Sequence, residues 1–379
     1  MFATTHTGSL PRPKDLTELL QAREDGQTPP NLDQRIAEAV REVVDRQVQA
    51  GVTMVNDGEM SKIGYSTYVT NRLTGFSRAA QSPPQRPLFD VAEFPDLQDY
   101  RRPVSPSIRY AYAAECTGDI KPRDTAAVQT DIANLKAAAQ SAGAQQVFMS
   151  AASPGVVAVF IPDKHYGSHE RYVGAIAEAM RPEYRAIVDA GLTLQVDCPD
   201  LAMVGNRYGS LEEFRRIMNI NMDALNHALS GLPADRVRIH ICWGNYEGPH
   251  NHDVELKDII DIILRANAAG LSLEACNPRH AHEWHVFEDT PLPDDKYVIP
   301  GVIDSTNNFV EHPDLIAQRL LNYANVVGAD RVMGGSDCGF GTFAGVSNVA
   351  PSVVWAKFQS MAEGARRATA RAKTPVAAR

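Results

Sequence analysis

The chain alternates between apolar, β-branched runs and longer amphipathic stretches along most of its 379 residues. The strand-like runs lie near residues 2–8, 52–57, 146–150, 192–197, 237–242, 271–275, 298–303 and 331–335. The helical patterns lie near 32–50, 124–142, 168–190, 211–229, 255–268, 312–327 and 351–367. A strand, a helix and a second strand in succession build a parallel βαβ unit. Eight such strands predict an α/β fold, a (β/α)8 TIM barrel with a long insertion after strand two.

A doubly wound open sheet is the alternative, but no glycine-rich dinucleotide motif follows the first strand. We expect one barrel domain over 1–365, with an insertion at about 77–116. Residues 77–107 are rich in Pro, Gln, Arg and Asp, which favours a lid, a packing arm or a subunit contact, and 108–116 are expected to add a short strand. The tail, 366–379, is expected to be disordered.

Charge and cysteine usage exclude several classes of protein. The formal net charge of −9 argues against nucleic-acid or anionic-membrane partners. The chain has no apolar run of about 18 residues and no signal peptide, so we expect a cytoplasmic protein without a membrane span. Its five cysteines are odd in number and widely spaced, which favours metal binding or reactive thiols over disulfides. A homo-oligomer remains open.

Metal-ligand side chains follow three of the late strands. His240 and Cys242 are two residues apart and therefore share one face of their strand. Glu274 and Cys338 lie at the ends of two further strands. One imidazole, two thiols and a carboxylate suit tetrahedral Zn²⁺. A barrel gathers its strand ends at one face, so we expect these four residues to hold zinc, with Cys276 as a competitor for the place of Glu274.

Other polar groups end the remaining strands. Glu59 and Asp197 are expected to face inward and to act on substrate, with a structural salt bridge as the alternative. A reaction that develops an alkoxide would also need an acid to protonate it. His6, Tyr65, Tyr68 or a loop histidine could serve. The segment 279–285, with three histidines, could suggest a second metal site, but a mobile loop over the barrel mouth is the preferred interpretation.

The order of these motifs resembles the C-terminal catalytic barrel of cobalamin-independent methionine synthase. The segments that carry the resemblance are Thr-Thr-His-Thr-Gly-Ser-Leu-Pro-Arg-Pro, Asn-Asp-Gly-Glu, Leu-Gln-Val-Asp-Cys-Pro, His-Ile-Cys, Leu-Glu-Ala-Cys, Pro-Gly-Val-Ile-Asp and Ser-Asp-Cys-Gly, in order from about 4 to 345. The resemblance implies a zinc ion held by His240, Cys242, Glu274 and Cys338. It also implies that Ser9, Glu59 and Asp197 bind an amino acid.

The sequence departs from that family at three places. Cys198 stands where the family has an acid, and Thr306 falls where it has a proton-handling histidine. Residues 151–155 replace the Gly-Pro-Val-Thr segment near the folate, and the family's second, N-terminal barrel is lacking. The zinc and thiol half is thus retained and the methyl-folate half altered. Single-barrel relatives include short methionine synthases and the zinc enzyme that adds coenzyme M to epoxyalkanes.

These features predict a zinc-dependent transferase that acts on a small-molecule thiol. A zinc-activated thiolate attacks a methyl donor or a similar electrophilic carbon, as in methionine synthase. The first alternative is thiol addition to an epoxide, and the second is a decarboxylase or hydrolase on a barrel like that of uroporphyrinogen decarboxylase. The residues expected at the substrate are Glu59, Asp197 and His6 for catalysis, with Ser9, Tyr65 and Arg279 for binding. If the thiol carries a sulfonate, the two acids must point elsewhere or be neutralised by Arg12, Lys62 or Arg279.

Overall fold

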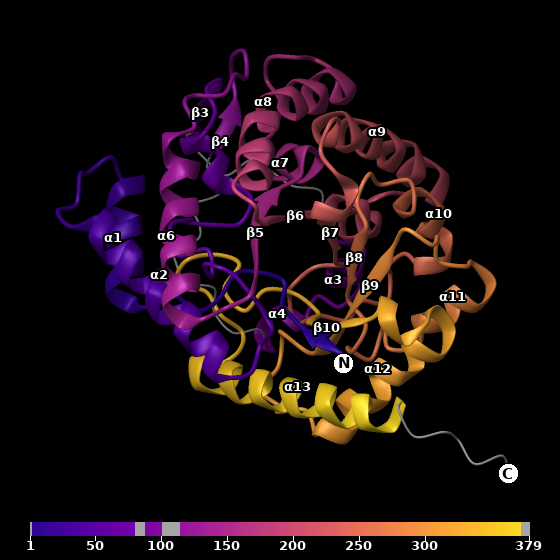
Figure 1. Ribbon diagram of the computed structural model, residues 1–379. Helices are drawn as coiled ribbons and strands as arrows, with labels where there is room; N and C mark the ends of the chain where they lie inside the picture. The colour runs from indigo at the N-terminus through magenta and orange to yellow at the C-terminus, as the bar shows by residue number, and fades with distance from the viewer. Residues whose placement is uncertain (1, 80–87, 101–113, 373–379) are drawn as a thin grey trace, which may run out of the picture.

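The computed structural model describes residues 2–79, 88–100 and 114–372. Eight parallel strands form a central barrel, and helices surround it (Figure 1). The strands are β1 Ala3–Thr4, β2 Met54–Val55, β5 Gln146–Ala152, β6 Thr193–Asp197, β7 Val237–Ile241, β8 Gly270–Leu273, β9 Tyr297–Ile303 and β10 Met333–Ser336. Their order is β1-β10-β9-β8-β7-β6-β5-β2. The predicted (β/α)8 barrel is confirmed, and each strand overlaps a predicted run.

The two end strands of this sheet approach each other and close the ring. The backbone N–H of Thr53, just before β2, donates to the carbonyl of Thr4 in β1 over 3.1 Å. The Thr53 hydroxyl donates to the same carbonyl over 2.7 Å. Closure leaves the sheet with little exposed edge and brings the ends of all strands to common faces.

The helices pack against the outer surface of the barrel. They are α1 Lys14–Glu24, α2 Leu32–Gln49, α6 Ala126–Ala142, α7 Pro154–Phe160, α8 His169–Asp189, α9 Leu211–Leu229, α10 Ile260–Ile263, α11 Val286–Asp289, α12 Pro313–Val327 and α13 Pro351–Ala372. Apolar residues recur at helical spacing on the inward faces, as with Ile36, Val40 and Val43 of α2, all of which are buried. None of the helices within the described ranges is long and apolar enough to cross a membrane.

Polar side chains fill the interior of the barrel near the middle of the strands. Arg238 of β7 is fully buried, and its Nε donates to Oε1 of Gln195 over 2.8 Å. Its Nη1 reaches the Thr5 hydroxyl and its Nη2 the His6 carbonyl, both over 3.1 Å. The guanidinium also lies 3.7 Å from the ring centre of Phe148. These buried contacts of Arg238 support the layer of residues at the strand ends.

The insertion after β2 is partly described. Its strands β3 Phe76–Arg78 and β4 Ala114–Cys116 pair antiparallel, and its helices are α3 Phe89–Glu93 and α4 Leu97–Tyr100. The expected strand at 108–116 is therefore present in its last three residues, and 101–113 lie outside the described residues. In Figure 1 the labels of α3 and α4 fall over the centre of the barrel, inside the ring of helices.

The structure corrects three sequence predictions. The helix expected over 255–268 is only a 3-10 turn, Leu256–Asp258, followed by α10. It ends early because Asn226 of α9 donates to the Arg265 carbonyl over 3.0 Å and accepts from the Asn267 N–H over 2.8 Å. Helices α1 and α7 were not expected.

The third correction concerns the tail that was expected to be disordered from residue 366. Helix α13 continues to Ala372, because Arg367 pairs with Asp314 over 3.1 Å and with Glu363 over 2.7 Å. The remainder of that tail, 373–379, lies outside the described residues, and the division into one barrel domain stays a prediction.

Candidate metal centre

His240, Cys242 and Cys338 meet at the C-terminal ends of β7 and β10. One ligand atom from each lies within 4.8 Å of the other two, and all three residues are buried. His240 and Cys242 share a face because they are two positions apart on an extended chain, as predicted. The Cys338 thiol arrives from the turn after β10. Three of the four expected ligands are therefore brought together.

The two sulfur atoms interact directly. A hydrogen bond from the neighbouring Cys242 thiol lowers the pKa of Cys338 to about 6, against the opposing effect of burial. The same contact, together with burial, raises the pKa of Cys242. The pair therefore favours one thiolate beside one thiol, and thiolate is the form in which cysteine binds metals.

The imidazole of His240 has one ring nitrogen available to a ligand. Its Nδ1 lies 3.2 Å from the Ser272 hydroxyl of β8, while Nε2 is buried and has no hydrogen-bond partner among the described residues. A hydrogen bond at one ring nitrogen, with the other nitrogen left free for a ligand, is the arrangement typical of a metal-bound histidine. One imidazole nitrogen and two sulfurs within 4.8 Å fit zinc.

Glu274 lies near this group, but it is not one of the residues whose ligand atoms all lie within 4.8 Å of one another. The carboxyl is buried, and Asn277 Nδ2 donates to its Oε2 over 3.3 Å. Burial first, and then the charges of Asp337 and Cys338, raise its pKa well above the usual range. A nearby cation would relieve that repulsion. Cys276, the competing ligand, donates its thiol to Asp337 Oδ2 over 3.1 Å and stands outside the group.

The two carboxylates expected at the substrate lie together beside the metal group. Asp197 on β6 is in register with His240 on β7, so their side chains are neighbours on the inner face. Burial, and then the charge of Glu59, raise the pKa of Asp197 to about 7, while the imidazole of His240 opposes this. Gln195 Nε2 donates to Asp197 Oδ1 over 2.7 Å. Two interacting buried acids are what a cationic ligand group would stabilise.

Glu59 is held in an unusual backbone conformation. Its φ of 59° is left-handed, which costs a non-glycine residue about 1 kcal/mol or more. Its N–H donates to Asp57 Oδ1 over 3.0 Å, which stabilises the turn. The Ser150 hydroxyl donates to Glu59 Oε1 over 2.6 Å. The other oxygen, Oε2, lies 3.8 Å from the Arg12 guanidinium and is buried without a hydrogen-bond partner among the described residues.

Two cations stand behind these acids. Arg12 donates from Nε to the Glu59 carbonyl over 3.1 Å. Lys62 donates from Nζ to the Ser150 carbonyl over 2.6 Å and lies 4.4 Å from the ring centre of Tyr68. Arg12 and Lys62 were predicted only as neutralising groups, and they do flank the acid pair.

The remaining predicted substrate residues lie at different depths. Ser9 is buried, and a Cβ added at Gly339 would lie 2.0 Å from its hydroxyl oxygen, so Ser9 adjoins the loop that carries Cys338. The ring of Tyr65 lies 5.8 Å from that of Phe160 and 5.7 Å from that of Phe343, at the barrel mouth. Arg279 lies in the loop after β8, and its N–H donates to Asn277 Oδ1 over 3.0 Å.

His6 sits inside the barrel wall. Its Nε2 lies 2.8 Å from Gln47 Oε1, and its ring contacts those of Phe148 and Phe358 at 5.5 and 5.2 Å. Burial lowers its pKa to about 3. A neutral imidazole packed in this way is a poor proton donor at neutral pH, so the geometry gives no support to an acid role.

The histidine-rich segment after β8 is packed, which differs from the mobile loop that we expected. His280 stacks on Trp243 at 4.0 Å between ring centres. Its Nδ1 lies 2.8 Å from Glu283 Oε2 and its Nε2 lies 3.2 Å from Asp253 Oδ2. These contacts with two carboxylates and the indole pack His280 against the end of β7 and the loop that follows it. Trp243 directly follows Cys242, so this packing supports the end of β7 that carries His240 and Cys242.

The insertion after β2 contacts the loops that follow β6 and β7. Asn206 Oδ1, after β6, accepts from the N–H groups of Phe89 over 3.0 Å and Asp90 over 3.3 Å. The carboxylate of Asp90, which is fully buried, accepts from the Tyr246 hydroxyl over 2.6 Å and from the His250 N–H over 3.1 Å. The described part of the insertion is therefore a packing arm over the C-terminal ends of β6 and β7.

Two of the departures from the methionine synthase pattern are visible as local structure. The Thr306 hydroxyl donates to Asp304 Oδ1 over 2.7 Å and so turns back toward its own loop. Ser153 caps helix α7 by accepting from the Val156 N–H over 3.0 Å and donates to Asp200 Oδ1 over 2.5 Å. The side-chain hydroxyls of both residues therefore have hydrogen-bond partners within the chain, Asp304 for Thr306 and Asp200 for Ser153.

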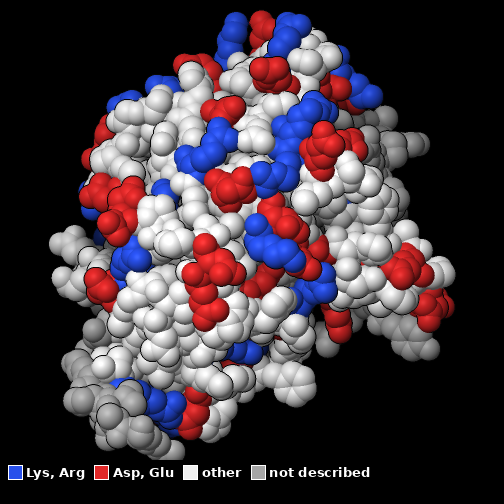
Figure 2. Space-filling model, turned by 90° about the vertical axis from the view of Figure 1, so that its right-hand side faces the viewer, with Lys and Arg blue, Asp and Glu red and all other residues white. Residues whose placement is uncertain are grey.

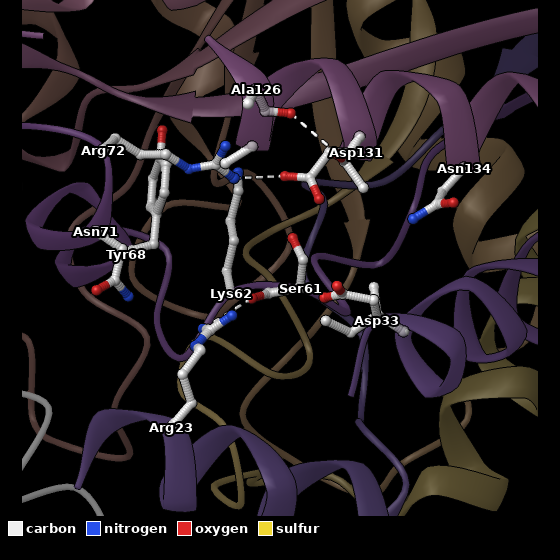
Figure 3. A pocket seen from close by; sticks show the side chains of 13 residues that line it. Arg23, Asp33, Ser61, Lys62, Tyr68, Asn71, Arg72, Ala126, Asp131 and Asn134 are labelled. Carbon is white, nitrogen blue, oxygen red and sulfur yellow. Dashed lines mark hydrogen bonds and ion pairs between the residues drawn. The ribbon is translucent and has the colours of Figure 1, made fainter. Parts of the chain in front are cut away.

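A separate cavity of about 320 Å³ opens between α2 and α6. Figure 3 shows Arg72 pointing to Asp131 and Arg23 pointing to the Ser61 carbonyl across it. These contacts measure 2.5 and 3.1 Å. Arg72 and Asp131 pair with each other in this cavity, so it is a weaker candidate site than the strand ends. On the side of the molecule in Figure 2, Lys and Arg are interspersed with Asp and Glu, which is typical of a solvated surface.

Comparisons with known proteins agree with the architecture and the motif order. No protein-family model matches the chain. It is 25% identical over 346 residues to the 2-hydroxypropyl-CoM lyase of Xanthobacter autotrophicus, covering 83% of this chain and 82% of that protein. It is 23% identical over 370 residues to the methionine synthase of Saccharolobus solfataricus, covering 97% and 94%.

Solved structures show the same fold. The B12-independent methionine synthase from Shewanella sp. W3-18-1, in complex with selenomethionine, has a TM-score of 0.75 at 19% identity, covering 98% of this chain and 99% of that one. A vitamin-B12-independent methionine synthase described from Listeria monocytogenes has a TM-score of 0.68 at 18% identity, covering 97% and 98%. The resemblance of this chain to the cobalamin-independent methionine synthase family is confirmed, and its relatives also include a lyase.

Proposed function

We propose that this protein transfers an alkyl group, most simply a methyl group, to a small-molecule thiol at a zinc site. His240, Cys242 and Cys338 would hold the ion, and Glu274 would complete a four-ligand set. The observation that carries the proposal is the meeting of these three ligand atoms within 4.8 Å, beside the acids Glu59 and Asp197. Zinc, when bound, lowers the pKa of a ligated thiol enough to make it a thiolate at neutral pH.

The residues of the chain would bind and orient the thiol substrate. Glu59 and Asp197 would take its cationic amine, because two buried carboxylates without a cation repel each other. Ser9 would contact the same molecule from the loop beside Gly339. In the reaction the thiol loses its proton, a sulfur–carbon bond forms, and the bond from that carbon to its leaving group breaks with its electron pair.

Thiol addition to an epoxide is the second candidate. The similarity to a 2-hydroxypropyl-CoM lyase supports it, as does Thr306, which stands where the methionine synthase motif has histidine. Against it stands the acid pair, since Glu59 and Asp197 would repel a sulfonate-bearing thiol. The chain spans 94% of the archaeal methionine synthase that it matches, so its length does not argue against methionine synthesis.

The test is metal content followed by a paired substrate screen. Protein purified without added metal should contain about one zinc per chain, and Cys242→Ser or Cys338→Ser should lose it. Cys116→Ser is the matched control, because that thiol donates to the Gly118 carbonyl and stands outside the metal group. The screen sets homocysteine with methyl donors against 2-mercaptoethanesulfonate with epoxides. Full zinc occupancy in the Cys242/Cys338 double variant would refute the proposal.

A further inference from the structure

Arg207, in the loop after β6, has no anionic partner in the part of the chain that the structure describes. It ends the 3-10 helix Met203–Arg207 in the loop after β6 and is half-buried. Its Nε is fully buried and has no hydrogen-bond partner, and no ion pair joins its guanidinium to any acid within the described ranges. A guanidinium removed from water in this way is disfavoured unless something compensates its charge.

The surroundings of Arg207 are aromatic. Burial lowers the pKa of Arg207, and the groups near enough to oppose this are the tyrosines Tyr208, Tyr246 and Tyr65. Tyr65 belongs to a trio of rings with Phe160 and Phe343. Tyr65, Tyr208, Tyr246 and Phe343 come from the loops after β2, β6, β7 and β10, and Phe160 ends helix α7 after β5, so Arg207 lies among segments that follow the C-terminal ends of the strands.

A hydrogen bond ties the 3-10 helix Met203–Arg207 to the end of β7. The N–H of Met203 donates to the carbonyl of Cys242 over 3.2 Å. Arg207 lies four residues further along the same 3-10 helix, which rises about 2 Å per residue, so the two residues are on the order of 8 Å apart along the helix axis. Asn206 in the same helix holds the first residues of α3. Hydrogen bonds therefore tie this helix both to Cys242 and to the first residue of α3, which fixes the position of Arg207 close to the end of β7.

We propose that Arg207 binds an anionic group of the alkyl donor, so that the donor is an organic anion. The shared chemistry is a carboxylate, sulfonate or phosphate, each of which a guanidinium can bind through two hydrogen bonds. The thiol substrate would lie deeper, against Glu59 and Asp197, which repel an anion. The proposal deepens the alkyl-transfer function and rests on it.

The test uses ring-bearing probes that differ only in charge. Benzoate, benzenesulfonate and phenyl phosphate are titrated calorimetrically into the zinc-loaded protein at low salt, with neutral benzamide as reference. At least one anion should bind the native protein ten- to a hundred-fold more tightly than benzamide, roughly the worth of charged hydrogen bonds. Arg207→Gln should abolish the preference. Arg216→Gln, which alters an exposed arginine on α9, should keep it.

A second variant separates binding from folding. Arg207→Met should keep its zinc and melt at or above the native temperature, since it removes an uncompensated charge, while losing the anion preference. Equal binding of all four probes, or an unchanged preference in Arg207→Gln, would overturn the proposal. So would a lower melting temperature with zinc loss in Arg207→Met. Cys242→Ser should keep the anion preference, which distinguishes failure here from failure of the zinc chemistry.

Discussion

Replacing Asp197 by Asn should stabilise the metal-free protein at alkaline pH and weaken its use of the thiol. Burial and Glu59 raise the pKa of Asp197 from 3.8 to about 7. At a pH between these two pKa values, Asp197 keeps its proton in the native state and has lost it in the unfolded chain. The free energy of unfolding therefore falls as pH rises through this window, and stability that is present below about pH 4 is lost above pH 7.

The size of the effect follows from the shift. Each pKa unit corresponds to about 1.4 kcal/mol, so this carboxyl costs up to about 4 kcal/mol at pH 8. With an unfolding entropy near 2.1 cal/mol/K per residue, that energy corresponds to about 5 °C in a chain of 379 residues. Asp197→Asn is neutral at every pH and can still accept from Gln195, so it should escape the loss.

Calorimetric melts of chelator-treated protein between pH 4 and 8 measure this. The native and Asp197→Asn curves should meet near pH 4 and separate up to pH 8, while zinc-loaded Asp197→Asn shows a raised KM for an amino-thiol. Asp200→Asn is the control, because Asp200 is also buried with a pKa raised to about 6 but is held by Ser153 and Asn221. It should leave that KM unchanged. A stability difference independent of pH, or destabilisation at pH 8, would refute the reasoning.

Three further outcomes follow from the same contacts. His280→Ala should lower the melting temperature and weaken zinc binding about ten-fold, because it removes the support of Trp243 next to Cys242; unchanged zinc affinity in a competition assay would contradict this. Lys357→Met should cost about 3–5 kcal/mol by leaving the buried Glu311 unpaired, as chemical denaturation would reveal. Cys276→Ser should retain full zinc by metal analysis, whereas loss of the metal would make Cys276 a ligand.

The barrel was predictable because its signals are local. Strands β6 and β7 are apolar runs flanked by the long amphipathic helices α8 and α9, and the two-residue period alone places His240 and Cys242 on one face. Helix α9 was expected over the same residues, 211–229, that it occupies. The early end of α10 was not predictable, since it depends on the side chain of Asn226 from a neighbouring helix.

The finer parts of the site depend on tertiary contacts that no motif records. Glu274 and Cys276 are two residues apart just after β8, and only the fold shows that the Cys276 thiol is directed to Asp337. Arg207 carried no sequence signal, because its candidacy rests on the lack of a paired acid among the described residues. Arg12 and Lys62 were named from the sequence as neutralising groups, and only the structure shows that they lie against Glu59 and Ser150.

X-ray absorption at the zinc edge of protein purified without added metal tests the central claim most directly. Ligation by His240, Cys242 and Cys338 predicts about one zinc per chain, with two sulfur neighbours at about 2.3 Å and nitrogen or oxygen neighbours at about 2.0–2.2 Å. The Cys338→Ser variant should lose one sulfur or the metal. Zinc-free protein with full thiol-transfer activity, or a zinc coordinated only by nitrogen and oxygen, would contradict the account.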